Sequence, residues 1–131
     1  MESLYAQGVS LHIVSGNIID VIEIILGESV RFVDCIKAND FVFDENGNLA
    51  QIIGTKHEFI GKANYIKELC KLNGYNPDEV CFVGNGGNDE FVHLSGCKTV
   101  CINADDTDAN NTNIWHKSLN VNNLTEIEKE L

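Results

Sequence analysis

The sequence predicts an α/β fold in which an open, mostly parallel sheet has helices on its faces and includes one β-hairpin. Apolar strand-like segments alternate with helical segments along the 131 residues, and the helical segments end at glycines. Glycine-containing turns follow two of the apolar strands, at 14–17 and 84–89. Strands and helices that alternate at this spacing favour parallel pairing with crossover helices. We expect a single core domain that covers 1–131.

The first part of the chain predicts a strand, a helix and a hairpin. The apolar segment SLHIVSG at 10–16 is typical of a buried strand, and IIDVIEIIL at 18–26 is typical of a helix that ends at a glycine. A strand near 33–38 then leads to a hairpin with arms FVF at 41–43 and LAQII at 49–53. The intervening DENGN contains Asn-Gly, a pair typical of tight hairpin turns.

The second part predicts further alternating elements. The segment that begins GKANYIKEL has apolar residues at helical spacing, at Ala63, Ile66, Leu69 and Cys70, and predicts a helix that ends at Gly74. VCFV at 80–83 is typical of a buried strand. Beyond the glycine turn we expect a short helix that ends at Gly96, a strand at 98–104, a polar loop at 103–113 and a short strand at 118–121. The segment 122–131 predicts an amphipathic helix with Asn122 or Asn123 as its N-cap.

Composition excludes several classes of partner. The chain has 20 acidic against 9 basic residues and a net charge of -11, which argues against nucleic acid or an anionic membrane as the main partner. The longest apolar run contains Asp20 and Glu23 and is too short to span a bilayer. The five cysteines include no CxxC pair and the four histidines are dispersed, which favours free thiols in a reducing, cytoplasmic setting and no zinc site.

The turn VSGN at 14–17 is the first candidate site. The Ser15 hydroxyl and the Gly16 backbone N–H, at the start of a helix, are suited to hold a phosphate oxygen. A plainer interpretation is that Ser15 or Asn17 only caps the following helix. The residues alone do not decide between phosphate binding and helix capping.

The turn GNGGND at 84–89 is the second candidate site. Capping by Asn88 or Asp89 accounts for one residue, but not for three glycines and Asn85 within six positions. One carboxylate and two carboxamides suit a hard cation such as Mg²⁺, which prefers oxygen ligands and commonly bridges a carboxylate to a phosphate.

Lys62 is the third candidate, in the first turn of the helix that follows the hairpin. A cation is disfavoured at the positive end of a helix, which suggests a compensating anion such as a bound phosphoryl group. A solvated surface lysine is the plainer interpretation, and Lys56 is a neighbouring candidate.

Taken together, VSGN, GKANYIKEL and VCFVGNGGNDEFVHLSG resemble, in order and approximate spacing, the haloacid-dehalogenase-like phosphatases, and most closely their phosphoserine phosphatase branch. KANDFVFDENGNLAQIIG also resembles that branch, so the likeness covers most of the chain from Leu11 to Asn103. It implies a Rossmann-like sheet and hydrolysis of a small phosphorylated substrate. It further implies roles for six residues: catalytic Lys62, substrate-binding Ser15, Gly16 and Asn88, and the Mg²⁺ ligands Asn85 and Asp89.

The sequence departs from that family in two ways. The family pattern GDGxND has a metal-binding Asp where this chain has Asn85, which should lower metal affinity. The family's DxDxT segment, which supplies the nucleophilic Asp and the central strand, is absent from these residues, and neither Asp34 nor the run at 105–108 matches it. The cap that usually precedes the Ser motif is absent as well. Either the strands that bear Ser15 and the glycine turn pair directly, or a homodimer or a companion segment supplies the missing strand. We therefore expect the carboxyl-terminal part of such a phosphatase, which is truncated, split or degenerate.

Two functions follow from the residues and the resemblance. One is a Mg²⁺-dependent phosphomonoesterase core that is active only when an Asp-bearing segment is supplied. The other is a catalytically inactive module that binds phosphate or a protein partner, which Asn85 favours.

Overall fold

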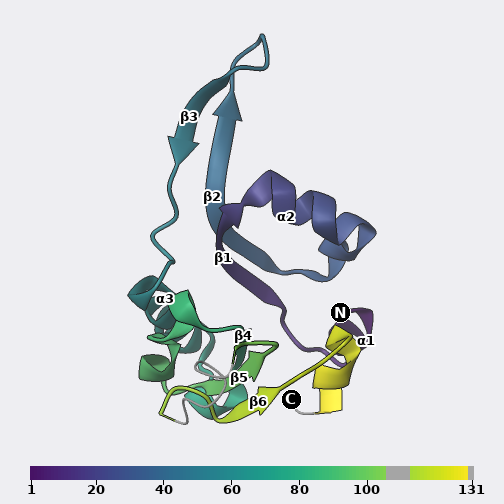
Figure 1. The fold of residues 1–131 in the computed structure, drawn as a ribbon, viewed down its shortest axis with the longest axis vertical. Helices are drawn as coiled ribbons and strands as arrows, with labels where there is room; N and C mark the ends of the chain where they lie inside the picture. Colours follow the sequence, from purple (N-terminus) through teal and green to yellow (C-terminus); the bar gives the residue numbers. More distant parts are fainter. Residues whose placement is uncertain (106–112, 130–131) are drawn as a thin grey trace. The chain divides into compact units, whose positions relative to one another are not determined.

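The structure is a computed structural model that describes residues 1–105 and 113–129. The described chain forms two compact units, which we call unit 1, Met1–Glu58, and unit 2, Phe59–Leu131. Figure 1 shows the helices and strands of both. Each unit is considered by itself, and a single core domain over 1–131 stays a prediction.

Unit 1 is built on a three-stranded sheet in the order β1-β2-β3. β1 pairs with β2 in parallel, and β2 pairs with β3 in antiparallel as the predicted hairpin. The sequence suggested separate strands at 33–38 and 41–43, but these residues belong to one long strand. The elements of unit 1 are α1 (Glu2–Ala6), β1 (His12–Ile18), α2 (Ile19–Leu26), the 3-10 helix η1 (Gly27–Phe32), β2 (Cys35–Phe43) and β3 (Leu49–Ile53).

The hairpin forms as predicted, but its loop spans 44–48 and only the glycine of the Asn-Gly pair has a positive φ, so it is not the tight two-residue turn that this pair indicates. Gly47 has φ 79, a left-handed conformation that glycine adopts without a steric cost. Its N–H donates to the Asp44 carbonyl over 3.0 Å, and the Asp44 carboxylate accepts from the N–H groups of Asn46 and Asn48. These hydrogen bonds hold the pKa of Asp44 below its usual range.

α2 confirms the helix expected after the first strand and packs against β1 and β2. Ile22 is its one buried side chain, whereas Ile24 and Ile25 are 79% and 73% exposed. The helix begins after Ile18, which makes no side-chain cap hydrogen bond, and it ends at Gly27 with φ 53. Within unit 1, most of the apolar surface of α2 therefore stays uncovered.

A polar cluster joins the amino-terminal ends of β1 and β2. The Asp34 carboxylate accepts from the Ser10 hydroxyl over 2.9 Å and from the Leu11 N–H over 2.8 Å, and Ser10 Oγ lies 3.0 Å from His12 Nε2. The backbone hydrogen bond from Leu11 and then the one from Ser10 lower the pKa of Asp34. Burial lowers the pKa of His12, although Asp34 opposes that shift.

Unit 2 is built on a second three-stranded sheet, in the order β4-β5-β6, with all strands parallel. β4, β5 and the helix α3 confirm the predicted alternation, and α3 ends at Gly74 in the left-handed conformation, as expected. The elements of unit 2 are α3 (Ile60–Asn73), η2 (Pro77–Glu79), β4 (Cys81–Gly84), η3 (Gly87–Asp89), η4 (Val92–Ser95), β5 (Lys98–Ile102), β6 (Lys117–Leu119) and η5 (Leu124–Lys129).

The core of unit 2 includes thiols used as small apolar groups. Ile66 and Cys70 of α3 pack with Val92 of η4 and Cys97, and the half-buried Val80 and Phe82 lie against them. All five cysteines are free, and burial raises the pKa of Cys70, Cys81 and Cys97. A raised pKa keeps a thiol protonated and unreactive, which agrees with a packing role.

Two helices expected in unit 2 are 3-10 helices instead. The segment expected as one short helix at 90–96 holds only η4, whose end at Gly96 is as predicted. The terminal segment forms η5, with the Asn123 side chain accepting from the Thr125 N–H over 3.0 Å. Part of the predicted polar loop, at 106–112, lies outside the described residues.

No helix in the described part of the chain is long and apolar enough to cross a membrane.

Replacing Asp34 should change the acid stability of unit 1. Because the folded-state pKa of Asp34 is lowered, its hydrogen bonds stabilise the fold above the unfolded pKa of about 3.9 and are lost as the pH falls through the folded pKa. Asp34→Asn should therefore lower the urea midpoint at pH 7, and the difference from the parent should shrink below about pH 4. Circular dichroism at several pH values would measure this.

Glu45→Gln, at the exposed hairpin turn, is the matched control and should leave the pH profile unchanged. A difference between Asp34→Asn and the parent that stays constant down to pH 2 would contradict the role given to Asp34.

Candidate functional site

Lys62 lies in the first turn of α3 and is 5% exposed, so the surface-lysine interpretation is wrong. The helix has no acidic residue in its first turn. Gly61 and Ala63 on either side of Lys62 are also buried. A buried ammonium at the positive end of a helix needs an anionic partner.

The turn after β4 supplies that partner. Gly86 and Gly87 have φ 119 and φ 35, which non-glycine residues rarely adopt. This path brings the chain back on itself, with the Asp89 N–H donating to the Gly86 carbonyl over 2.8 Å. Asp89 is 4% exposed as a result.

Lys62 and Asp89 form a buried ion pair in which Lys62 Nζ donates to Asp89 Oδ1. The second carboxylate oxygen, Oδ2, accepts from the Asn85 backbone N–H over 3.2 Å. A Cβ at Gly84 would overlap the Asp89 carboxylate, so this position requires glycine. The ring of Phe82 lies 5.9 Å from Nζ and adds a cation–π contact.

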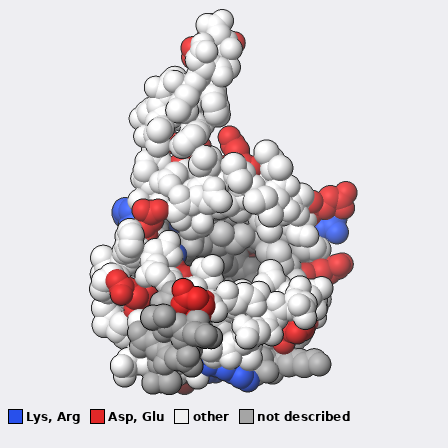
Figure 2. Space-filling view, in the orientation of Figure 1, with Lys and Arg blue, Asp and Glu red and all other residues white. Residues whose placement is uncertain are grey.

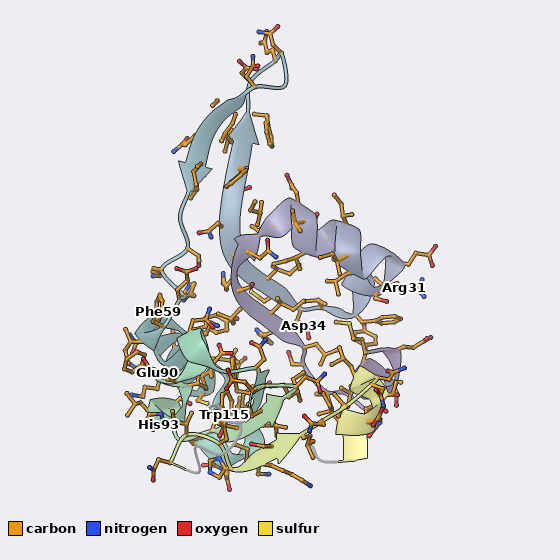
Figure 3. The ribbon with its side chains drawn as sticks, in the orientation of Figure 1. Arg31, Asp34, Phe59, Glu90, His93 and Trp115 are labelled. Atoms are coloured by element: carbon orange, nitrogen blue, oxygen red, sulfur yellow. The ribbon has the colours of Figure 1, made fainter. Side chains whose placement is uncertain are left out.

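Phe59 is the N-cap residue of α3 and is labelled in Figure 3 at the start of that helix. It has φ 48 and ψ -122, an unfavourable conformation for a residue with a Cβ. Its carbonyl accepts from the Lys62 N–H over 3.1 Å. Sequence reasoning missed this strained residue because nothing in a phenylalanine signals a positive φ.

The described residues do not make a complete Mg²⁺ site. Asp89 is the only carboxylate of the turn, and both of its oxygens are already engaged by Lys62 and by the Asn85 backbone. The side chains of Asn85 and Asn88 are on exposed residues and carry no charge. Within residues 1–105 and 113–129, no three His, Cys, Asp or Glu side chains converge as a metal site.

In unit 1, Ser15 and Asn17 do not cap α2. The N-cap residue is Ile18, and the Ser15 hydroxyl oxygen instead accepts from the Asn17 N–H over 3.1 Å. Ser15 therefore lies within β1, in the stretch between Val14 and Ile18 where the pairing with β2 shifts register. The plainer helix-capping interpretation is wrong.

Two polar residues that the sequence did not single out surround Gly16. The Asn39 side chain donates to the Gly16 carbonyl over 2.6 Å and accepts from the Thr55 N–H over 2.8 Å. A Cβ at Gly16 would overlap the Glu58 carboxylate, so glycine leaves room for that group. No spacing rule connects Asn39 or Glu58 with the VSGN turn, because tertiary packing alone brings them there.

The structure brings Lys62, Asp89 and the backbone of Asn85 together within unit 2. Lys56 is exposed, as is Asn88. Ser15 and Gly16 belong to unit 1. That the two turns share one site stays a prediction.

The other features of unit 2 lie away from the ion pair. His93 and Trp115, both labelled in Figure 3, line a pocket of about 260 Å³ that neither Lys62 nor Asp89 borders. Acidic side chains are scattered over the face shown in Figure 2 without forming a single patch. An anion would have to rely on local donors rather than on the net charge of the protein.

Comparisons with known proteins show similarity in structure. No protein-family profile matches the chain. No curated protein matches it in sequence. A phosphoserine phosphatase in apo form aligns with a TM-score of 0.79 and 21% identity, over 99% of this chain and 62% of that chain. A substrate-bound phosphoserine phosphatase gives 0.76 and 20%, over 99% and 60%.

A hydrolase of the haloacid dehalogenase family from Salmonella enterica subsp. enterica serovar Typhi aligns with a TM-score of 0.72 and 16% identity, over 91% of this chain and 39% of that chain. The chain thus has the α/β fold of these haloacid-dehalogenase-like hydrolases, as its motifs predicted. It spans about 60% of the length of the phosphoserine phosphatases that it matches.

Removing the Asp89 charge should destabilise unit 2. Asp89→Asn leaves the Lys62 ammonium buried without its counter-charge, at a cost of about 3–5 kcal/mol. The double variant Lys62→Met with Asp89→Asn removes that charge and should recover much of the loss. Fluorescence of the sole tryptophan, Trp115, which is 4% exposed in unit 2, would follow unfolding in urea.

Glu90→Gln, next to Asp89 and exposed, is the control and should leave the urea midpoint almost unchanged. An Asp89→Asn variant as stable as the parent would show that the ion pair does not matter for folding. A loss without recovery in the double variant would show that the unpaired Lys62 charge is not its cause.

The strain at Phe59 should appear in a comparison of glycine with alanine. Phe59→Gly should be more stable than Phe59→Ala by about 1–3 kcal/mol, because only glycine adopts this conformation without strain. Lys67, exposed in the middle of α3, is the control, where glycine should be less stable than alanine by about 1 kcal/mol. Equal or reversed stabilities at residue 59, by Trp115 fluorescence, would mean that no strain is stored there.

Proposed function

We propose that this chain is the phosphoryl-binding part of a haloacid-dehalogenase-like phosphatase that hydrolyses a small phosphomonoester. The observation that carries the proposal is the buried Lys62–Asp89 pair, which joins the first turn of α3 to the glycine turn after β4. Desolvating a charged pair is costly, and folding alone does not require it. A buried ammonium whose orientation is fixed can stabilise the negative charge that develops on an anion during a reaction.

In this proposal each candidate residue has a distinct role. The Lys62 ammonium faces the phosphoryl oxygens and is held in position by Asp89. The Ser15 hydroxyl, the Gly16 backbone N–H and the Asn88 carboxamide donate to the same group. Because the neighbours of known structure include phosphoserine phosphatases, phosphoserine is the first substrate to test. Five free cysteines suit a cytoplasmic enzyme.

Hydrolysis needs a carboxylate nucleophile, and we propose that a companion segment supplies it. The nucleophilic Asp attacks phosphorus and the ester P–O bond breaks, while the second Asp of the added DxDxT segment gives its proton to the leaving alcohol. That Asp then takes a proton from the water that hydrolyses the acyl phosphate, which releases phosphate. In the described residues β1 ends one sheet and β4 ends the other, and each has one unpaired edge. An unpaired parallel strand edge is suited to accept an added strand.

In this proposal, activity depends on Mg²⁺ only after the companion segment has bound and completed the site. The described residues offer Asp89 alone as a carboxylate, and Lys62 already holds it. Added carboxylates would be needed before Asn85 and Asp89 contribute to a magnesium site.

A second function is favoured by Asn85, which carries no charge, and by the Lys62–Asp89 pair, in which both carboxylate oxygens are already engaged. Without a second carboxylate in the turn, the chain acts as an inactive module that binds phosphate or a protein partner. The two functions differ in one observable: binding accompanies turnover in the first and occurs without turnover in the second.

The test is turnover of phosphoserine and of a generic aryl phosphate, with and without Mg²⁺, before and after addition of a DxDxT-bearing segment. We expect turnover only when both are present. Lys62→Ala and Ser15→Ala should each lower kcat by about tenfold or more, because each removes a group that contacts the reacting phosphoryl. Asn85→Asp should lower the Mg²⁺ concentration required, because it adds a charged oxygen ligand.

Lys56→Ala, an exposed neighbour, is the control and should keep full activity. Phosphate binding without any turnover after the segment is added would favour the inactive module. Neither binding nor turnover would remove both functions.

A further inference from the structure

Three of the asparagines stand directly before a glycine, in the pairs Asn46–Gly47, Asn73–Gly74 and Asn85–Gly86. Asparagine is a chemically labile residue, and a following glycine favours the loss of its side-chain amide, because no Cβ hinders the glycine nitrogen from approaching the asparagine Cγ. All three asparagines are exposed, so water reaches each of them. Exposure therefore does not distinguish the three pairs.

The glycine N–H is already engaged in two of the pairs. The Gly47 N–H donates to the Asp44 carbonyl over 3.0 Å in the hairpin loop. The Gly74 N–H donates to the Cys70 carbonyl at the end of α3. The glycine nitrogen must lose its proton before it can attack the side chain, so these hydrogen bonds have to break first. Both pairs are therefore protected in the folded chain.

Gly86 differs from the other two glycines. Within residues 1–105 and 113–129, its N–H donates to no acceptor, and the Asn85 side chain makes no hydrogen bond. A buried residue whose backbone N–H has no partner is rare. The neighbouring groups are held instead, since the Gly86 carbonyl accepts from the Asp89 N–H over 2.8 Å and the Asn85 N–H donates to Asp89 Oδ2 over 3.2 Å.

We propose that Asn85 deamidates spontaneously in the folded protein, with the Gly86 nitrogen as the nucleophile and water as the only co-reactant. The Gly86 nitrogen attacks Asn85 Cγ, the bond from Cγ to the side-chain nitrogen breaks, and ammonia leaves with the proton that Gly86 gives up. Water then opens the cyclic imide and releases a proton. Opening at Cγ gives aspartate, and opening at the main-chain carbonyl gives isoaspartate.

Deamidation changes the charge of the glycine turn. Asp89 is the only carboxylate of this turn, and Lys62 balances its charge. Aspartate at residue 85 supplies a second carboxylate that Lys62 does not balance, and two carboxylates on one turn are better suited to a hard cation than one. Isoaspartate lengthens the main chain by a methylene group and should disturb the turn. This consequence for metal binding rests on the proposed function, whereas the deamidation itself does not.

Tandem mass spectrometry of proteolytic peptides tests the proposal, after incubation of the full chain in mildly alkaline buffer. In the folded chain we expect Asn85 to deamidate at least about fivefold faster than Asn46 or Asn73, because each of those pairs must first lose a hydrogen bond. In the same chain unfolded in guanidinium chloride the three rates should be similar, since folding no longer engages any of the three glycine N–H groups.

Two results would overturn the proposal. The first is a folded chain in which Asn85 stays intact or reacts no faster than Asn46 and Asn73. The second is an unfolded chain in which Asn85 keeps the same advantage, because the folded structure would then not be the cause.

Asn85→Gln is the matched variant, because its longer side chain would have to close a larger ring. It should prevent deamidation at residue 85 and leave the rates at Asn46 and Asn73 unchanged. Isoelectric focusing should show an acidic species that accumulates with time in the parent and much more slowly in this variant, and circular dichroism checks that the variant is folded. An acidic species that accumulates equally fast in both chains would place the modification elsewhere.

A separate measurement tests the consequence for metal binding. Mg²⁺ should raise the urea midpoint of Asn85→Asp, followed by Trp115 fluorescence, more than that of the parent, because a ligand that binds the folded state stabilises it. An equal response of the two chains would reject the metal consequence. Deamidation rates would still decide the modification, and turnover with the added segment would still decide the proposed function.

Discussion

The buried pair of Lys62 and Asp89 is the interaction around which the candidate site of unit 2 is built. Neither group is stable there alone, because an unpaired charge in a desolvated site is far costlier than a paired one. The glycine turn follows from the same constraint. Gly84 leaves space for the Asp89 carboxylate. The positive φ angles of Gly86 and Gly87 let the chain reverse direction within a few residues, which places the Asp89 carboxylate beside Lys62 of α3. The turn that resembles a phosphate loop is thus first an arrangement that holds a carboxylate beside an ammonium.

The ion pair also limits the chemistry of the chain. Its charges cancel, so the pair offers no net positive charge to an anion. With Asn85 in the turn, a metal ion finds one carboxylate that is already engaged. The fold of haloacid-dehalogenase-like hydrolases is therefore present without a complete magnesium site in the described residues, and the chain spans 60% and 62% of the two phosphoserine phosphatases compared above.

Unit 1 differs from unit 2 in that many of its apolar side chains are exposed. Ile24 and Ile25 of α2 and several apolar side chains of the hairpin are exposed, and among the described residues no strand pairs with the outer edge of β1 or β3. Local hydrogen bonds, such as those of Asp34 and Asp44, fix the turns and strand ends but bury little apolar area. These surfaces favour association with another segment or chain, since burial of apolar area is the main stabilising term in folding and assembly.

Local sequence determined most of the elements: the hairpin at Asn46–Gly47, the end of α3 at Gly74 and the parallel strands around the two glycine turns all follow from short-range backbone preferences. Lys62 and Asp89 were identified as polar residues at the right ends of a helix and a strand. Only tertiary structure decided that they are buried together, that Asn39 and Glu58 surround Gly16, and that Phe59 adopts a positive φ. These features depend on contacts between residues far apart in the chain, which no local pattern encodes.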